Sequence, residues 1–191
     1  REQGFELNQS LHQSGVGRGM NAFLSILQEA FGEKFDTQLI QEKRPLIWRK
    51  VLEEDGLKRK PGFDDLLRYL EAQKIPRAIA TSTERELVTV RFRASGVDPT
   101  RFQSTFAGDE VPKPKPAPDV YLQAARNLGV DPSRCLALED SDVGAAAAHA
   151  AGIRVIVIPD LFPPNEKTRA FAFRVLDSLS GVPEIIEELR R

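Results

Sequence analysis

Two adjacent acidic residues, Glu139 and Asp140, follow the apolar run at 135–138 and precede an alanine-rich stretch. In an open parallel sheet, ligands collect beyond the carboxyl ends of the strands. Two carboxylates there concentrate negative charge, and such hard oxygen ligands beside a phosphate suit Mg²⁺. The pair therefore predicts a magnesium site. The structural alternative is a strand end with a solvated Glu139 and a helix capped by Asp140 or Ser141.

Hydroxyl side chains follow another short apolar run. Thr81, Ser82 and Thr83 come directly after Ala78–Ala80. A hydroxyl together with free backbone N–H groups at the start of a helix is suited to holding a phosphate. The same residues would also serve as an ordinary N-cap, which is the more frequent role of Ser and Thr.

A lysine lies within a proline-rich loop. Lys115 stands in "EVPKPKPAPDVYL", where four prolines restrict the backbone and make the loop stiff. An ammonium group fixed in this way can neutralise a phosphate and an attacking carboxylate together. Lys113 is a competitor for the role, and a solvated lysine in a linker is the structural alternative.

The pattern of elements from residue 58 onward indicates how these clusters are positioned. Short apolar runs at 78–80, 105–107, 135–138 and 154–158 predict strands, and helical patterns at 63–70 and 120–128, in the alanine stretch and at 182–189 alternate with them. Such alternation is typical of a parallel sheet covered by helices on both faces. We therefore predict an α/β fold with a three-layer Rossmann-like core at 58–191.

The first third of the chain reads differently. An amphipathic stripe predicts one helix, and it consists of Met20, Phe23, Leu24, Leu27 and Phe31. A second helix is predicted at 39–52, and no strand signal lies between the two. We predict a small helical cap at residues 5–57.

Composition excludes several classes of protein. The 191 residues include 27 basic and 28 acidic ones, so nothing favours a nucleic-acid surface or an anionic membrane. No stretch approaches the ~20 apolar residues of a membrane span. The single cysteine, Cys135, excludes an intramolecular disulfide and favours a reducing compartment, the cytoplasm. We expect a monomer or weak dimer.

Three segments taken together are more specific than any one of them. In order, "AIATST", "KPKPAPDVYL" and "LALEDSDVGAAAAHAAG" resemble the second, third and fourth motifs of the haloacid dehalogenase-like hydrolase superfamily. The resemblance is strongest to the phosphatase and β-phosphoglucomutase-like branch, which has a helical cap near its N-terminus. It covers residues 61–160 of the core and, more loosely, the cap.

The resemblance implies roles for the phosphate-binding residues. Thr81 would bind the transferring phosphoryl group, helped by the backbone of Ser82. Lys115 would hold the phosphate and the nucleophile, because "KPAPDVYL" matches the family run around its lysine. Pro114 stands where the family often has glycine.

The resemblance also implies a metal site and a contact from the cap. Asp140 would coordinate Mg²⁺, and Glu139 would bind it directly or through water. The segment "SGVGRG" resembles the part of the cap that closes over substrate, so Arg18 would meet a distal phosphate or carboxylate. The alternative for Arg18 is a surface arginine at a glycine-rich helix start.

The family's first motif, Asp-x-Asp at the end of the first strand, has no counterpart in the sequence. Asp140 and Asp142 have this spacing but belong to the fourth motif. We expect the nucleophile in a strand that precedes Arg1. Without this aspartate the chain should not turn over any substrate.

The resemblance thus implies a Mg²⁺-dependent phosphatase that hydrolyses a small phosphorylated metabolite through an aspartyl-phosphate, and a sugar phosphate would fit. A phosphomutase shares every core motif. A non-catalytic phosphate-binding protein is the alternative if the chain lacks a nucleophile. A dehalogenase is disfavoured because it does not need the acidic pair for Mg²⁺.

Overall fold

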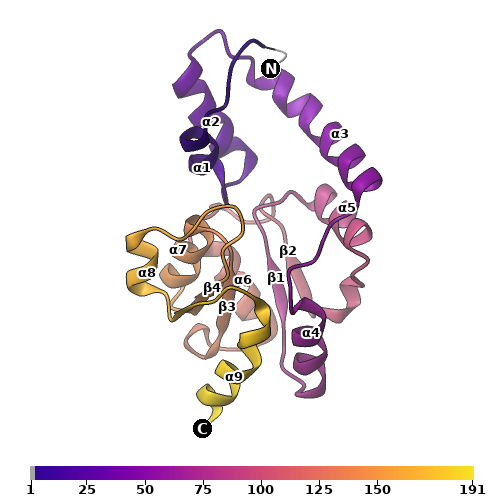
Figure 1. Cartoon of the computed structure of the whole chain (residues 1–191), viewed down its shortest axis with the longest axis vertical. Coiled ribbons are helices and arrows are strands. Elements are labelled where there is room, and N and C mark those ends of the chain that lie inside the picture. Colours follow the sequence, from indigo (N-terminus) through magenta and orange to yellow (C-terminus); the bar gives the residue numbers. More distant parts are fainter. Residues whose placement is uncertain (1–2) are drawn as a thin grey trace.

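The computed structural model describes residues 3–191, which form an α/β fold with a group of helices at one end (Figure 1). Three helices come first along the chain, and they are α1 (Gln9–Gly15), α2 (Met20–Phe31) and α3 (Thr37–Asp55). Asn8 and Asp36 cap α1 and α3 by accepting hydrogen bonds from backbone N–H groups, and Gly56 ends α3. The two helices predicted in this region are confirmed, whereas the short α1 was not predicted.

Helices and strands alternate along the rest of the chain. The helices are α4 (Phe63–Ala72), α5 (Arg85–Ser95), α6 (Asp119–Leu128), α7 (Asp142–Ala150), α8 (Glu166–Phe171) and α9 (Val182–Arg190). The strands are β1 (Ala78–Ala80), β2 (Ser104–Phe106), β3 (Leu136–Glu139), β4 (Arg154–Val157) and β5 (Arg174–Val175). The predicted α/β class with parallel strands is confirmed.

The strands belong to two separate parallel sheets. One sheet joins β1 to β2, with Ile79 opposite Thr105, and the other has the order β3-β4-β5, with Leu138 opposite Ile156. Figure 1 shows α7 and α8 beside the second sheet and α4 on the far side of the first. Within residues 3–191, β1 and β3 do not pair, so side chains must connect the two sheets. The further strand that we expected from residues preceding Arg1 stays a prediction.

The core divides into two apolar clusters on the strands. One packs the small side chains of α7 against β3, β4 and α6, and Ala145, Ala147 and Ala148 are fully buried in it. The other gathers α4 and α9 around Ile156, which is also fully buried. The run of alanines therefore lets α7 approach the sheet closely, because no longer side chain separates the two backbones. Among residues 3–191, no helix has both the length and the apolar character needed to cross a membrane.

Charged side chains on the surface connect α4 to the segment that precedes β2. Glu71 accepts two hydrogen bonds of 2.7 Å from the guanidinium of Arg101 and a third, of 3.2 Å, from Arg77. Glu110 accepts a similar pair from Arg85. These hydrogen bonds lower the pKa of both carboxyl groups below their ordinary value of 4.5.

We therefore expect the protein to lose stability in acid. Because the folded pKa values of Glu71 and Glu110 lie below the unfolded values, the unfolded state binds more protons at low pH. Their contribution to the free energy of unfolding is complete above the unfolded pKa of 4.5 and disappears as pH falls through the folded values. Urea denaturation at a series of pH values measures this. In Glu71→Gln the acid-dependent loss should be smaller, and an equal loss in both proteins would contradict the prediction.

Candidate active site

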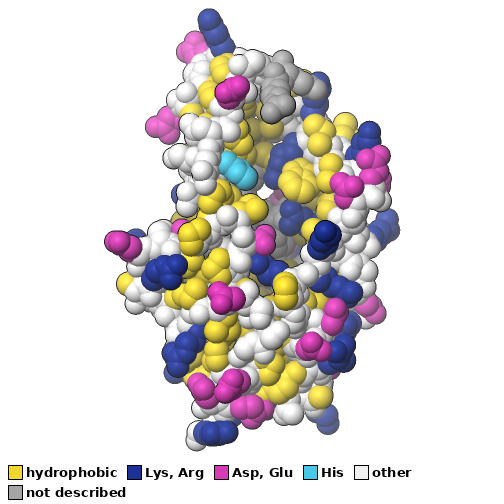
Figure 2. Space-filling view, viewed as in Figure 1, with side chains coloured by type: hydrophobic (Ala, Val, Ile, Leu, Met, Phe, Trp, Pro, Cys, Tyr) yellow, Lys and Arg dark blue, Asp and Glu magenta, His cyan; other side chains and the backbone are white. Residues whose placement is uncertain are grey.

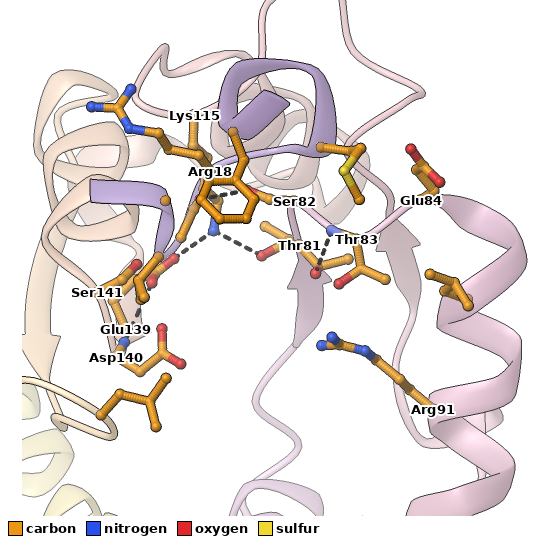
Figure 3. A pocket seen from close by; sticks show the side chains of 18 of the residues that line it. Arg18, Thr81, Ser82, Thr83, Glu84, Arg91, Lys115, Glu139, Asp140 and Ser141 are labelled. Carbon is orange, nitrogen blue, oxygen red and sulfur yellow. Dashed lines mark hydrogen bonds and ion pairs between the residues drawn. The ribbon is translucent and has the colours of Figure 1, made fainter. Parts of the chain in front are cut away.

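The polar residues singled out in the sequence, at 81–83, 115 and 139–140, lie together at one end of the strands, around a cavity of about 550 Å³. Helices α2, α3 and α5 contribute to its walls, and the ends of β1 and β3 form its floor (Figure 3). Each of the six predicted site residues lines this cavity; they are Arg18, Thr81, Ser82, Lys115, Glu139 and Asp140. The opening is visible in the space-filling view between the upper helices and the α/β part (Figure 2).

Lys115 lies at the centre of a buried polar cluster. Its Nζ donates to the carbonyl oxygen of Ala80 at the end of β1 (3.0 Å) and to Oε1 of Glu139 at the end of β3 (2.5 Å). Both side chains are only 7% exposed. The ammonium group thus connects the two sheets at the point where their backbones do not pair. Lys113, the competitor in the same loop, is exposed.

Tyr121 completes this cluster, although no pattern in the sequence singled it out. Its hydroxyl donates to the carboxylate of Glu139, and Lys115 Nζ lies 3.5 Å from its oxygen and 4.8 Å from its ring centroid. Burial, reinforced by the negative charge of Glu139, raises the pKa of Tyr121 well above 10. The phenol therefore stays protonated and remains a donor. The only sequence signal was its position six residues after Lys115 on a helix that faces the sheet.

Glu139 and Asp140 are adjacent in sequence but differ in surroundings. The carboxylate of Glu139 is enclosed beneath α7, where a Cβ on Gly144 would lie 2.0 Å from its Oε2. Asp140 is exposed at the cavity, and Figure 3 shows its side chain on the cavity floor. The enclosing protein, together with the charge of Glu139, raises the pKa of Asp140. Both acids line the cavity, as expected, but Glu139 turns inward toward Lys115.

The donor set suits a hard cation with few protein ligands. Among residues 3–191, no group of three or more His, Cys, Asp or Glu side chains gathers as a metal site. Mg²⁺ usually keeps several waters and takes one or two carboxylates together with phosphate oxygens. Asp140 offers one such carboxylate at the cavity, where burial and the neighbouring charge of Glu139 raise its pKa. The residues present therefore fit Mg²⁺.

The hydroxyl cluster after β1 forms a tight turn at the cavity. Thr81 donates its backbone N–H to Phe106 at the end of β2, and its Oγ1 accepts from the N–H of Thr83 (3.0 Å). The backbone of Gly108 passes so close that a Cβ there would lie 2.5 Å from the carbonyl oxygen of Ser82. The Thr81 hydroxyl accepts one hydrogen bond, so its own proton can still be donated to an anion.

The glycine-rich segment between α1 and α2 meets this turn directly. Ser82 Oγ donates to the carbonyl oxygen of Gly17 (2.8 Å). Gly17 has a φ of +78°, and a Cβ on it would lie 2.4 Å from Ser141 Oγ, so only glycine fits here. Arg18 follows, with its Nε donating to the carbonyl oxygen of Ser14 (2.9 Å). The hydroxyl of Ser82 is thus engaged with the helices above the cavity, and Arg18 lines the cavity from the same side.

Comparisons with known proteins agree with this arrangement. The family model for haloacid dehalogenase-like hydrolases matches residues 6–152. The CbbY protein of Rhodobacter capsulatus is 40% identical over 131 residues, covering 68% of this chain and 58% of that protein. A probable pseudouridine-5'-phosphatase of Drosophila melanogaster is 40% identical over 125 residues, covering 63% of this chain and 54% of that protein. The chain thus spans less than two thirds of these curated relatives.

A solved structure extends the likeness to three dimensions. A mutant CbbY from Rhodobacter sphaeroides, crystallised with xylulose-(1,5)bisphosphate, superimposes with a TM-score of 0.81 at 30% identity, covering 93% of this chain and 81% of that one. The family model matches well over half of the chain, and the motif segments meet at one cavity. The chain therefore belongs to the haloacid dehalogenase-like hydrolase family.

Proposed function

We propose that this protein is a Mg²⁺-dependent phosphomonoesterase that acts on a small phosphorylated metabolite. The observation that carries the proposal is the buried Lys115 ammonium, which is bonded to the ends of both β1 and β3 beside the cavity. A fixed positive charge at that point can stabilise the charge on a phosphoryl group as its bond to the leaving oxygen breaks. The relatives named as a phosphatase and as CbbY support the same class of reaction.

In this proposal the turn after β1 binds the phosphoryl group. Thr81 donates its hydroxyl proton to a phosphoryl oxygen, and the backbone of Ser82 assists. The side chain of Ser82 has a second role, since its bond to Gly17 ties the turn to the helices above the cavity. Lys115 supplies the positive charge from below.

Asp140 would hold Mg²⁺, and Glu139 would bind it directly or through water, with its Oε1 already bonded to Lys115 and Tyr121. When bound, the ion would neutralise charge on the phosphoryl oxygens. The attacking carboxylate is assigned to no residue from 3 to 191; its place in a segment before Arg1 stays a prediction.

The helices at residues 5–57 would act as a cap over a core at 58–191. They form the upper wall of the cavity. In Figure 1 the chain passes to the α/β part after α3, and the segment after α1 reaches down to it. Closure would exclude bulk water during the reaction, and opening would release the product. A sugar phosphate fits as substrate, because a CbbY relative was solved with a xylulose bisphosphate.

The direct test is Asp140→Asn in the full-length protein that the gene encodes. Loss of the carboxylate should lower kcat by about 10²–10³-fold on the best substrate of a phosphorylated-metabolite panel with Mg²⁺ present, as removal of one charge-stabilising group does in other enzymes. Asp142→Asn is the matched control. The carboxylate of Asp142 accepts a hydrogen bond from the backbone N–H of Asn165 and does not line the cavity.

Two results would count against the proposal. Undiminished Mg²⁺-dependent activity in Asp140→Asn would refute the metal assignment. Failure of the full-length protein to hydrolyse any member of the panel would refute the phosphatase itself. Phosphorus NMR of the products separates hydrolysis from transfer, because a phosphomutase would return the phosphate to another position of the same metabolite.

A further inference from the structure

Tyr121 belongs to the buried cluster around Lys115 but does not line the cavity. Its side chain is only 8% exposed and packs in the apolar cluster that also contains Ala145 and Ala148 of α7. Helix α6, which carries Tyr121, packs against β1 and β2, whereas Glu139 ends β3 of the other sheet. The residues at the cavity surface include Lys115 and Glu139 but not Tyr121. Any role of its hydroxyl in the reaction must therefore act through these neighbours.

The carboxylate of Glu139 is held at both of its oxygens. Oε1 accepts hydrogen bonds from Lys115 Nζ (2.5 Å) and from the Tyr121 hydroxyl, and Oε2 accepts one from the backbone N–H of Asp140 (3.3 Å). The backbone of Gly144 lies so close to Oε2 that a Cβ there would be 2.0 Å from it. Helix α7 thus blocks one side of the carboxylate, and the Tyr121 hydroxyl holds the other.

The ammonium of Lys115 takes its position from this carboxylate. A lysine has three N–H donors, and two of them go to the carbonyl oxygen of Ala80 (3.0 Å) and to Oε1 of Glu139. The Tyr121 oxygen, at 3.5 Å, is too distant to be a strong acceptor. The third N–H can therefore be donated to a phosphoryl oxygen in the cavity that Lys115 lines. Whatever fixes Oε1 also fixes the ammonium.

Loss of the Tyr121 hydroxyl would free one side of Glu139. Phenylalanine keeps the ring, whose centroid lies 4.8 Å from Lys115 Nζ, so the hydrogen bond alone is removed. The carboxylate can then turn toward the vacated space, and the ammonium bonded to it moves as well. A displacement of 1 Å near the reacting atoms can cost about 10²-fold in rate.

We propose that Tyr121 is a positioning residue of the hydrolysis. Its hydroxyl holds Oε1 of Glu139, and Glu139 in turn holds the Lys115 ammonium at the place where it meets the phosphoryl group. The inference rests on the proposed function in that Lys115 acts on a phosphoryl group at this cavity. An ammonium stabilises most where negative charge develops as the bond breaks, so the effect of Tyr121 belongs mainly to the transition state.

Steady-state kinetics of Tyr121→Phe in the full-length protein test this inference, with Mg²⁺ and the best substrate of the phosphorylated-metabolite panel. We expect kcat to fall about tenfold and KM to change by less than about twofold, because ground-state binding is kept. Tyr69→Phe is the matched control. Tyr69 is the other tyrosine of the chain, and its hydroxyl also donates to a glutamate, Glu187, but at the surface between α4 and α9. This control should keep the wild-type kcat and KM.

The binding of two anions measures the same effect without turnover. Orthovanadate accepts a fifth oxygen ligand and so resembles the transition state of phosphoryl transfer, whereas inorganic phosphate resembles the ground state. In calorimetric titrations, vanadate should bind about tenfold more weakly to Tyr121→Phe than to the wild type, and phosphate affinity should stay within about twofold. An equal loss for both anions would indicate a merely structural role and overturn the inference. Thermal unfolding verifies that each variant is folded.

A double variant tests whether Tyr121 acts through Glu139. In Glu139→Gln the carboxylate that links Tyr121 to Lys115 is already absent. Adding Tyr121→Phe should therefore weaken vanadate binding by less than about twofold further, because both changes break the same chain of bonds. A further tenfold loss in that background would show that the hydroxyl acts by another route, and the inference would be wrong.

The outcomes separate this inference from the proposed function. If the wild type hydrolyses phosphate esters and Tyr121→Phe does so equally well, the positioning role is wrong and the proposed function stands. If vanadate binding is selectively weakened in Tyr121→Phe but the wild type hydrolyses no phosphate ester, the proposed function is wrong and the positioning of Lys115 stands. If the wild type neither hydrolyses a phosphate ester nor binds vanadate, both are wrong.

Discussion

Replacing Lys115 with methionine is expected to lower the free energy of unfolding by about 3–5 kcal/mol, as breaking one side of a buried ion pair does in other proteins. The substitution leaves the carboxylate of Glu139 buried, with Tyr121 as its remaining side-chain partner. It also removes the side chain that bonds β1 to β3. The same variant should lose turnover, because the positive charge beside the phosphoryl group is gone. Chemical denaturation and a phosphatase assay measure the two effects.

A double variant separates the buried charge from the rest of the effect. Adding Glu139→Gln to Lys115→Met removes the unpaired charge, so a substantial part of the lost stability should return. Activity should not return, because the ammonium is still absent. Lys113→Met is the matched control, and this exposed residue should change stability by less than about 0.5 kcal/mol. If Lys113→Met were as damaging as Lys115→Met, the assignment of the loop lysine would be refuted.

Replacing Ile156 with alanine is expected to lower the free energy of unfolding by about 2–5 kcal/mol, since a buried isoleucine loses both transfer free energy and packing. Ile156 lies at the middle of the three-stranded sheet, opposite Leu138 of β3, and has no exposed surface. Its side chain belongs to the cluster between the sheet and helices α4 and α9. The cavity left behind cannot collapse easily, because helices and strands on every side fix its walls.

The control for this second prediction is an apolar residue of the same size on the surface. Leu46 of α3 is 67% exposed, so Leu46→Ala should change stability by no more than about 0.5 kcal/mol. Urea denaturation of both variants gives the comparison. A loss below about 1 kcal/mol in Ile156→Ala would contradict the packing described here.

Much of the site was predictable because its residues lie at the carboxyl ends of short apolar strands. A single parallel sheet, as predicted from the sequence, would place these ends along one edge, and Thr81 after β1 and Asp140 after β3 do line the same cavity, although the two strands belong to separate sheets. The choice of Lys115 over Lys113 came from the family motif, and only Lys115 is buried. The predicted roles in phosphate and metal binding stay predictions until the variants are measured.

Other features could not be predicted from local patterns. Glu139 and Asp140 are neighbours in the chain, but the extended backbone at the end of β3 points them in different directions, and the inner side chain pairs with Lys115. Tyr121 looked like an ordinary apolar position of α6 until packing placed its hydroxyl against Glu139. Helix α5 was not predicted.

The sequence by itself determined the α/β class, the order of the strands along the chain and the family, because strand and helix periodicity and short motifs are local properties. Only the tertiary structure decided which charges are paired. It buried Lys115 with Glu139 and brought the Tyr121 hydroxyl from α6 to the same carboxylate. The physical reason is that the energy of a charge depends on which groups surround it and how far water is excluded. Those surroundings come from helices and strands far apart in the chain.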